Sequence, residues 1–162
     1  MKCFALFGLL AVLVVTGTAA ARSGGQNDGT LTVKSADGRV VMSAFKGAVI
    51  GRFDKGQVTI KDPNPNDGIG PIVTGADLTL PLSEKTTRYS GSNIRFRMIG
   101  LSSVTVFGNN INLSAIGRGL IQLNGTITRG FADDGTYAVN GSAAQPFPPF
   151  PFTFPLDAQS GP

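Results

Sequence analysis

The stretch TLTVKSADGRVVMSAFK, residues 30–46, places two β-prone runs on either side of an Asp-Gly pair. Thr30–Ala36 and Arg39–Lys46 are rich in residues that favour strands, and Asp37-Gly38 joins them. A two-residue Asp-Gly link favours a tight turn between antiparallel strands, because both of its positions take a positive φ. The stretch therefore predicts a β-hairpin at the start of the folded part of the chain.

The residues that follow repeat this arrangement. Ala48–Phe53 and Gln57–Lys61 flank the triplet Asp54-Lys55-Gly56. A glycine in the last position of a three-residue loop suits the left-handed conformation that such a loop needs. A second hairpin is therefore expected directly after the first.

Glycines at positions 100, 108, 117 and 125 then recur every eight or nine residues. Short strands separated by turns at intervals of eight to twelve residues are typical of sandwiches and barrels. The rival architecture is a solenoid, whose coils take about 20 residues or more in the common classes, and no longer repeat is evident. The sequence therefore predicts an all-β fold, a single antiparallel β-sandwich or barrel of short strands.

The segment QPFPPFPFTFPL, residues 145–156, is dense in phenylalanine and proline. Phe150, Phe152 and Phe154 fall at every second position, so in an extended chain they point to one face. Proline has no N–H, so such a strand can pair on one side at most. We expect an edge strand or polyproline segment clamped over the core. The alternatives are a proline-rich ligand for a partner's aromatic groove and a disordered tail.

The first residues predict export. Lys2 precedes an apolar run at 4–15, and Ala19 and Ala21 supply the small residues of a cleavage site. A positive start, a short apolar core and small residues at the end make a secretory signal peptide. A membrane-spanning helix needs about 20 apolar residues, which is more than this run provides. A secreted or extracytoplasmic protein with no stable transmembrane segment after processing is therefore expected.

This assignment divides the chain into four parts. They are a helical signal peptide at 1–21, a flexible leader at 22–29, the all-β domain at 30–156 and a C-terminal tail at 157–162.

The composition excludes several chemistries. The chain has no histidine, and its one cysteine, Cys3, lies in the expected signal peptide. Serine-histidine and cysteine-histidine catalysis, imidazole ligation and thiolate zinc sites are therefore absent. Glu84 is the only glutamate, so a carbohydrate-active enzyme would have to rely on aspartates. The net charge of +4 is mild and does not indicate nucleic-acid binding, and no cofactor is expected.

The stretch DPNPNDG, residues 62–68, carries oxygen ligands in an alternating pattern. Calcium loops of the EF-hand type have such a pattern, with glycine at the sixth position and glutamate at the twelfth. Here these positions hold Asp67 and Val73. We expect a turn-rich loop whose side chains bond its own backbone. The alternative is a non-standard calcium site with Asp62, Asn64, Asn66 and Asp67 as ligands.

Arginines form a second candidate site. Apolar residues at 94, 96 and 98 alternate with Arg95 and Arg97, which predicts a strand with one apolar and one basic face. With Arg88, these arginines are candidates for binding an anionic cell-surface polymer or lipid. The alternative is a solvated outer face without a ligand.

Four stretches resemble segments of small secreted bacterial proteins of unknown function. They are DPNPNDG at 62–68, SGSNIRFRMIG at 90–100, LSAIGRG at 113–119 and DGTYAVNG at 134–141, with Gln145-Pro146 after the last. The resemblance runs across most of residues 50–150. It implies an exported bacterial protein with an all-β domain, and it supplies no catalytic or binding residues.

By elimination, the sequence favours a non-catalytic secreted or cell-envelope β-domain that acts as a structural or interaction module. Its partner would be a cell-envelope polymer or protein. The alternatives are a polyanion- or metal-binding module and an aspartate-based carbohydrate-active enzyme.

Overall fold

The computed structural model describes residues 25–126 and 135–161, so the expected signal peptide lies outside the described residues. All regular structure in the described part is strand, and it contains no helix. The strands are β1 (Gly29–Lys61), β2 (Ile72–Ser83), β3 (Thr86–Gly125), β4 (Thr136–Val139), β5 (Gln145–Pro146) and β6 (Phe152–Leu156). Every pairing between them is antiparallel. The prediction of an all-β, antiparallel fold is confirmed.

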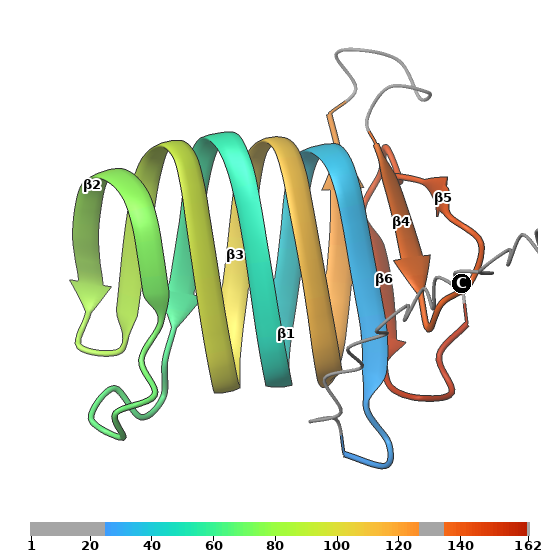
Figure 1. Cartoon of the computed structure of the whole chain (residues 1–162), viewed down its shortest axis with the longest axis horizontal. Helices are drawn as coiled ribbons and strands as arrows, with labels where there is room; N and C mark the ends of the chain where they lie inside the picture. Colours follow the sequence, from blue (N-terminus) through green and yellow to red (C-terminus); the bar gives the residue numbers. More distant parts are fainter. Residues whose placement is uncertain (1–24, 127–134, 162) are drawn as a thin grey trace, which may run out of the picture.

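The two long strands, β1 and β3, are wound around each other as a coil. Val49 of β1 pairs with both Met98 and Ala115, which lie 17 positions apart along β3. Ala115 in turn pairs with both Leu31 and Val49, which lie 18 positions apart along β1. Each strand therefore pairs with successive turns of the other on both of its sides. Figure 1 shows these turns stacked along the long axis of the molecule.

Glycines form two rows along the edges of this coil. One row is Gly91, Gly56, Gly108, Gly38 and Gly125, and the other is Gly100, Gly47, Gly117 and Gly29, each paired with the next. At Gly47 a Cβ would lie 2.1 Å from the carbonyl oxygen of Ile116, and at Gly56 a Cβ would lie 2.1 Å from the carbonyl oxygen of Phe107. At Gly47 and Gly56 the backbones approach so closely that only glycine fits.

Bulges near the edges keep the apolar side chains directed inward. Ser35, Ala44 and Asn110 have φ angles of 50°, 48° and 51°. Around each of them the spacing of buried positions lengthens from two residues to three, as between Val33 and Ala36. An extra residue of this kind bends a strand and resets its alternation. The strand can therefore bend at the edge of the coil while its apolar side chains still point into the interior.

The interior of the coil is one hydrophobic core. Phe45, Phe53 and Phe147 are among its largest fully buried side chains. Burying such a side chain contributes roughly 1.5–3 kcal/mol. Because the core is enclosed by the coil itself, the outward side chains of β1 and β3 form the surface that is free to bind.

The glycine rows divide the coil into two walls. The front wall, which faces the viewer in Figure 1, contains residues 30–37, 48–55, 92–99 and 109–116, with the start of β2 and with β4. The back wall contains residues 39–46, 57–61, 86–90, 101–107 and 118–124, with the end of β2 and with β6.

The architecture corrects the predicted hairpins. β1 continues through Asp37-Gly38 and through Gly56 as one strand. The segments before and after Asp37-Gly38 do not pair with each other, because both pair with β3. All six strands join one sheet that is not closed into a barrel. A single wound sheet with two facing walls therefore takes the place of the predicted sandwich or barrel of short strands.

The phenylalanine-proline segment matches its prediction only in part. β6 pairs with residues 119–123 of β3, and Phe154 is buried in the core, as expected for a clamped edge strand. Phe150 and Phe152 are 61% and 38% exposed, so a shared buried face for all three is wrong. The physical reason is that Phe150 lies before β6 begins, while Phe152 is the first residue of β6, where its ring centroid is 5.4 Å from that of Phe154. The buried anchor is instead Phe147, which is fully enclosed.

Candidate binding surface

Several basic side chains lie side by side on the front wall. Arg52 of β1 pairs with Arg95 of β3, and Arg97 follows two positions further along β3. All three are exposed, because their neighbours Phe53 and Phe96 take the inward positions and are buried. The structure thus brings together Arg95 and Arg97, as the sequence predicts, and adds Arg52 to them.

A fourth cation extends this group across the wall. Asn112 pairs with Arg52 on the side away from Arg95. The side-chain oxygen Oδ1 of Asn112 accepts a hydrogen bond of 3.3 Å from the backbone N–H of Ser35, which places the exposed Lys34 beyond it. We call Lys34, Arg52, Arg95 and Arg97 the basic row. Two of its members lie in β1 and two lie in β3, and each of these strands crosses the front wall twice.

Arg88 does not belong to this surface. It pairs with Thr59 and with Leu80 on the back wall, and the edge at Gly91 separates it from Arg95 along β3. Its Nε donates a hydrogen bond of 3.4 Å to Oγ1 of Thr59. The expectation that all three predicted arginines form one stripe is therefore wrong, because the strand turns an edge between them.

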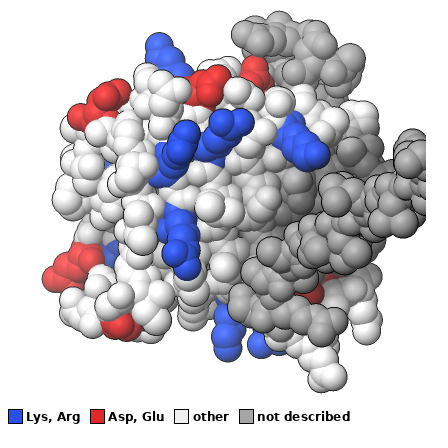
Figure 2. Space-filling model, viewed as in Figure 1, with Lys and Arg blue, Asp and Glu red and all other residues white. Residues whose placement is uncertain are grey.

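The basic row carries uncompensated charge. Among the described residues, none of its four members makes an ion pair within 4.0 Å. Figure 2 shows basic side chains across the middle of this face and acidic ones toward its margins. Asp54, next to the row in β1, accepts a hydrogen bond of 2.9 Å from Nδ2 of Asn110. Unpaired cations on one face create a positive potential that attracts anions.

Two of the four predicted calcium ligands, Asp62 and Asp67, bond the backbone of their own loop. Oδ1 of Asp62 accepts a hydrogen bond of 2.9 Å from the backbone N–H of Asn64. Oδ1 of Asp67 accepts one of 2.9 Å from the backbone N–H of Ile69. Both are turns in which an aspartate caps the chain two residues on. The loop is thus built as the sequence predicts for a turn-rich segment.

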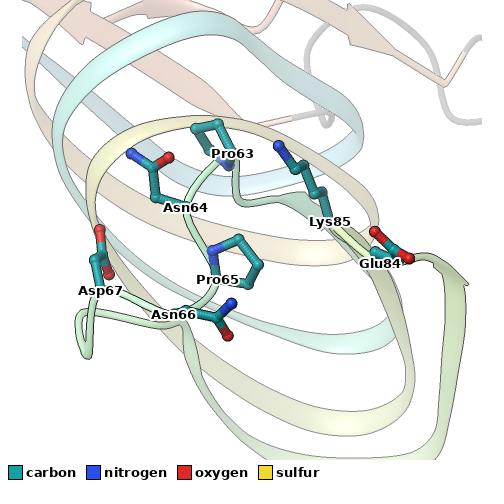
Figure 3. A pocket seen from close by; sticks show the side chains of 7 residues that line it. All are labelled: Pro63, Asn64, Pro65, Asn66, Asp67, Glu84 and Lys85. Carbon is teal, nitrogen blue, oxygen red and sulfur yellow. The ribbon is translucent and has the colours of Figure 1, made fainter.

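The remaining side chains of this loop line an open hollow with Glu84 and Lys85. In the view of Figure 3, Asp67 and Glu84 lie on opposite sides of the loop, with Pro65 between them. Asp62 is buried beneath the loop and does not line the hollow. Three of the four predicted ligands, Asn64, Asn66 and Asp67, therefore line the hollow, and Asp62 lies apart from it. Nowhere in the described ranges do three or more His, Cys, Asp or Glu residues form a group that could hold a metal.

Among the residues that the structure describes, two ionisable groups depart from their ordinary pKa values, and both lie at the end of the coil formed by β4 and β6. Burial raises the pKa of Tyr137, whose hydroxyl donates a hydrogen bond of 3.3 Å to Oε1 of Gln145. Hydrogen bonds from the Ser160 hydroxyl and the Gln159 N–H lower the pKa of Asp157. Neither group touches the basic row. They belong to the closure of this end of the coil, which the sequence does not reveal.

No protein-family model, curated protein or solved structure matches the chain. In the described part of the chain there is also no helix with the length and hydrophobicity needed to cross a membrane. The surface chemistry of the coil is therefore the basis for a functional proposal.

Proposed function

We propose that the protein is an exported, non-catalytic interaction module of the bacterial cell envelope or secretome, and that the basic row binds an anionic partner. The single observation that carries this proposal is the alignment of four exposed cations on one wall without an ion pair among the described residues. Export rests on the signal-peptide pattern of residues 1–21, and the bacterial context on the resemblance of residues 50–150.

The arrangement suits binding better than catalysis. The outward side chains of the front wall are held at fixed spacings by the pairing of β1 with β3. Directly opposed residues in such a ladder have Cβ atoms about 4.5–5.5 Å apart. A rigid array of this kind can match a repeating or densely charged surface. It needs no deep cleft and no group with a shifted pKa.

A sulfated polymer tests the proposal. We expect the protein to bind dextran sulfate and not neutral dextran, with an affinity that falls as salt rises because salt screens exposed charges. The variant Arg52→Gln/Arg95→Gln/Arg97→Gln should bind much more weakly. Each cation near an anionic surface is worth roughly 1 kcal/mol, or about fivefold in affinity.

The matched control removes the same charge from the back wall. Arg39→Gln/Lys61→Gln/Arg88→Gln has the same net charge as the front-wall variant. It should retain most of the affinity. Equal losses in the two variants would show that net charge, and not the basic row, drives binding, and the proposal would be wrong.

Export has its own test. Mass spectrometry of the exported protein should find an N-terminus near Arg22. A full-length chain that starts at Met1 and stays in the membrane fraction would contradict it.

A further inference from the structure

We infer that the anionic partner of the front wall is the headgroup surface of a lipid bilayer, and that exposed isoleucines beside the basic row enter the lipid. This inference rests on the proposed function, since it names the partner of the same wall. It is carried by an apolar patch that the binding of a polymer alone would leave unexplained.

The isoleucine patch consists of Ile50, Ile69, Ile72, Ile99 and Ile116. Ile50 and Ile72 are each 60% exposed, Ile69 is 51% exposed and Ile99 is 37% exposed. These side chains are β-branched residues on the outer face of a strand or in the adjoining loop, and they point away from the core.

The patch is continuous and has a cation at its centre. Arg97 pairs with Ile50 on one side and with Ile72 on the other. One shallow hollow is lined by Ile50, Ile99, Ile116 and Arg97, and a neighbouring one by Ile69, Ile72, Ile99 and Arg97. Ile99 and Arg97 are thus shared between the two hollows. The isoleucines form one surface and are not scattered singly.

Cations also border the patch on both sides. Arg52 and Arg95 lie along one side, as the basic row. On the other side, Lys46 and Arg118 line a third hollow together with Ile99 and Ile116. Asp28 is the one acidic residue lining that hollow. The isoleucine patch is therefore bordered by cations of the front wall on one side and by cations at the adjoining end of the back wall on the other.

A bilayer surface complements both properties at once. Proteins that lie on membranes combine an apolar face that enters the headgroup–acyl boundary with cations that meet anionic headgroups. A soluble polyanion would neutralise the arginines but leave the isoleucines in water. Contiguous exposed apolar surface rimmed by polar residues marks an interaction site, because it is otherwise unfavourable. The long arginine side chains can lie along the apolar surface while their guanidinium groups reach the phosphates.

Tryptophan reporters give the first test. The chain contains no tryptophan, so a single one introduced by Ile72→Trp reports on its own surroundings. Leu120→Trp is the matched control, because Leu120 is 49% exposed on the back wall. Vesicles of phosphatidylglycerol and phosphatidylcholine should shift the emission of Ile72→Trp to shorter wavelength, and brominated lipid should quench it. Leu120→Trp should show neither effect. Identical responses of the two reporters would overturn the inference.

A second set of variants separates this inference from the proposed function. Ile50→Thr/Ile72→Thr keeps β-branched residues at both exposed positions, so the fold should be unaffected. We expect it to weaken binding to the mixed vesicles by tenfold or more and to leave dextran sulfate binding unchanged. All variants begin near Arg22, as expected for the exported protein. They therefore lack the apolar run at 4–15, and that run cannot contribute to vesicle binding.

The outcomes are distinguishable. If dextran sulfate binds but the vesicles do not, or if vesicle binding ignores the isoleucines, the lipid inference fails and the proposed function stands. The partner would then be an anionic polymer or an acidic protein. If neither anionic probe binds, both fail. Binding to pure phosphatidylcholine as tightly as to the mixed vesicles would also overturn the inference, because the cations would then have no role.

Discussion

Gly47 of β1 and Gly117 of β3 lie directly opposite each other at one edge of the coil. A Cβ on Gly47 would stand 2.1 Å from the carbonyl oxygen of Ile116 and 2.6 Å from the Cα of Gly117. These are backbone atoms, so they cannot move aside without shifting the strand pairing itself. The contact fixes how tightly successive turns can stack.

The first prediction concerns this contact. Gly47→Ala should destabilise the protein by about 2–3 kcal/mol, because overpacking forces backbone shifts of that cost. Gly70→Ala is the matched control, since a Cβ at Gly70 would meet nothing within 4 Å. It should change stability by less than about 0.5 kcal/mol. Urea denaturation of both variants measures the difference, and equal midpoints would contradict the role of the glycine rows.

The second prediction concerns the closure of the coil by the C-terminal segment. Phe147 is fully buried, whereas Phe150 is 61% exposed. Phe147→Ala should cost about 3–5 kcal/mol, as expected for deleting a core phenylalanine. Phe150→Ala should cost less than about 0.5 kcal/mol. A larger loss at Phe150 than at Phe147 would show that the segment packs differently.

The third prediction concerns a buried hydroxyl. Oγ of Ser102 is buried without a hydrogen-bond partner among the described residues. An unsatisfied polar group in the core is unfavourable, so Ser102→Ala should stabilise the protein by about 1 kcal/mol. Ser103→Ala, at the adjacent outward position, should have little effect. A loss of stability in Ser102→Ala would mean that this hydroxyl has a partner, such as an ordered water.

The fourth prediction concerns alkaline pH. The pKa of Tyr137 is raised in the folded protein above its ordinary value of 10.0. As pH rises above 10, the unfolded chain loses this proton more readily than the folded one, so the stability conferred by Tyr137 falls. The stability advantage of the wild type over Tyr137→Phe should therefore shrink between pH 8 and about pH 11. The two proteins share every other ionisable group, so the comparison isolates the effect of Tyr137. A constant difference would contradict the shift.

The fifth prediction concerns calcium. The carboxylates of Asp62 and Asp67 are engaged with the backbone of their own loop. Millimolar calcium should therefore leave the melting temperature unchanged. A substantial rise that a chelator reverses would reveal a site, because a ligand that binds only the folded state stabilises it.

The strand content of this fold could be predicted, but its winding could not. Alternation at residues 94–98 and the β-prone runs of 30–61 correctly indicated strands with one inward face. The Asp-Gly pair at 37–38 predicts a tight turn, but β1 continues through it. The same glycine that allows a tight turn also allows a close backbone approach. The missed signal is the spacing of nine between glycines 29, 38, 47 and 56, which matches the half-turns of the coil. Only the pairing of β1 with β3 shows that this spacing corresponds to half-turns of a coil.

The candidate site, like the fold, could be predicted from the sequence only in part. Arg95 and Arg97 could be placed on one outward face from their alternation with buried residues. Arg52 and Lys34 could not be added, because strand register across distant parts of the chain is not readable from one sequence. Arg88 does not join them, because the chain passes from the back wall to the front wall at Gly91. In a wound sheet, residues that are close in sequence can lie on opposite walls, and residues that are far apart in sequence can lie side by side.

The winding of β1 and β3 also constrains the order in which the chain can fold. The pair closest in sequence is Lys61 with Thr86, 25 positions apart, while Gly29 and Gly117 are 88 positions apart. Loop-closure entropy must be overcome before distant pairs gain anything, so high contact order slows folding. We expect the first turn to form next to β2 and later turns to wrap onto it, each using the previous turn as a template. The basic row is complete only when the turn that carries Lys34 docks beside Asn112, so full capacity to bind should be acquired late.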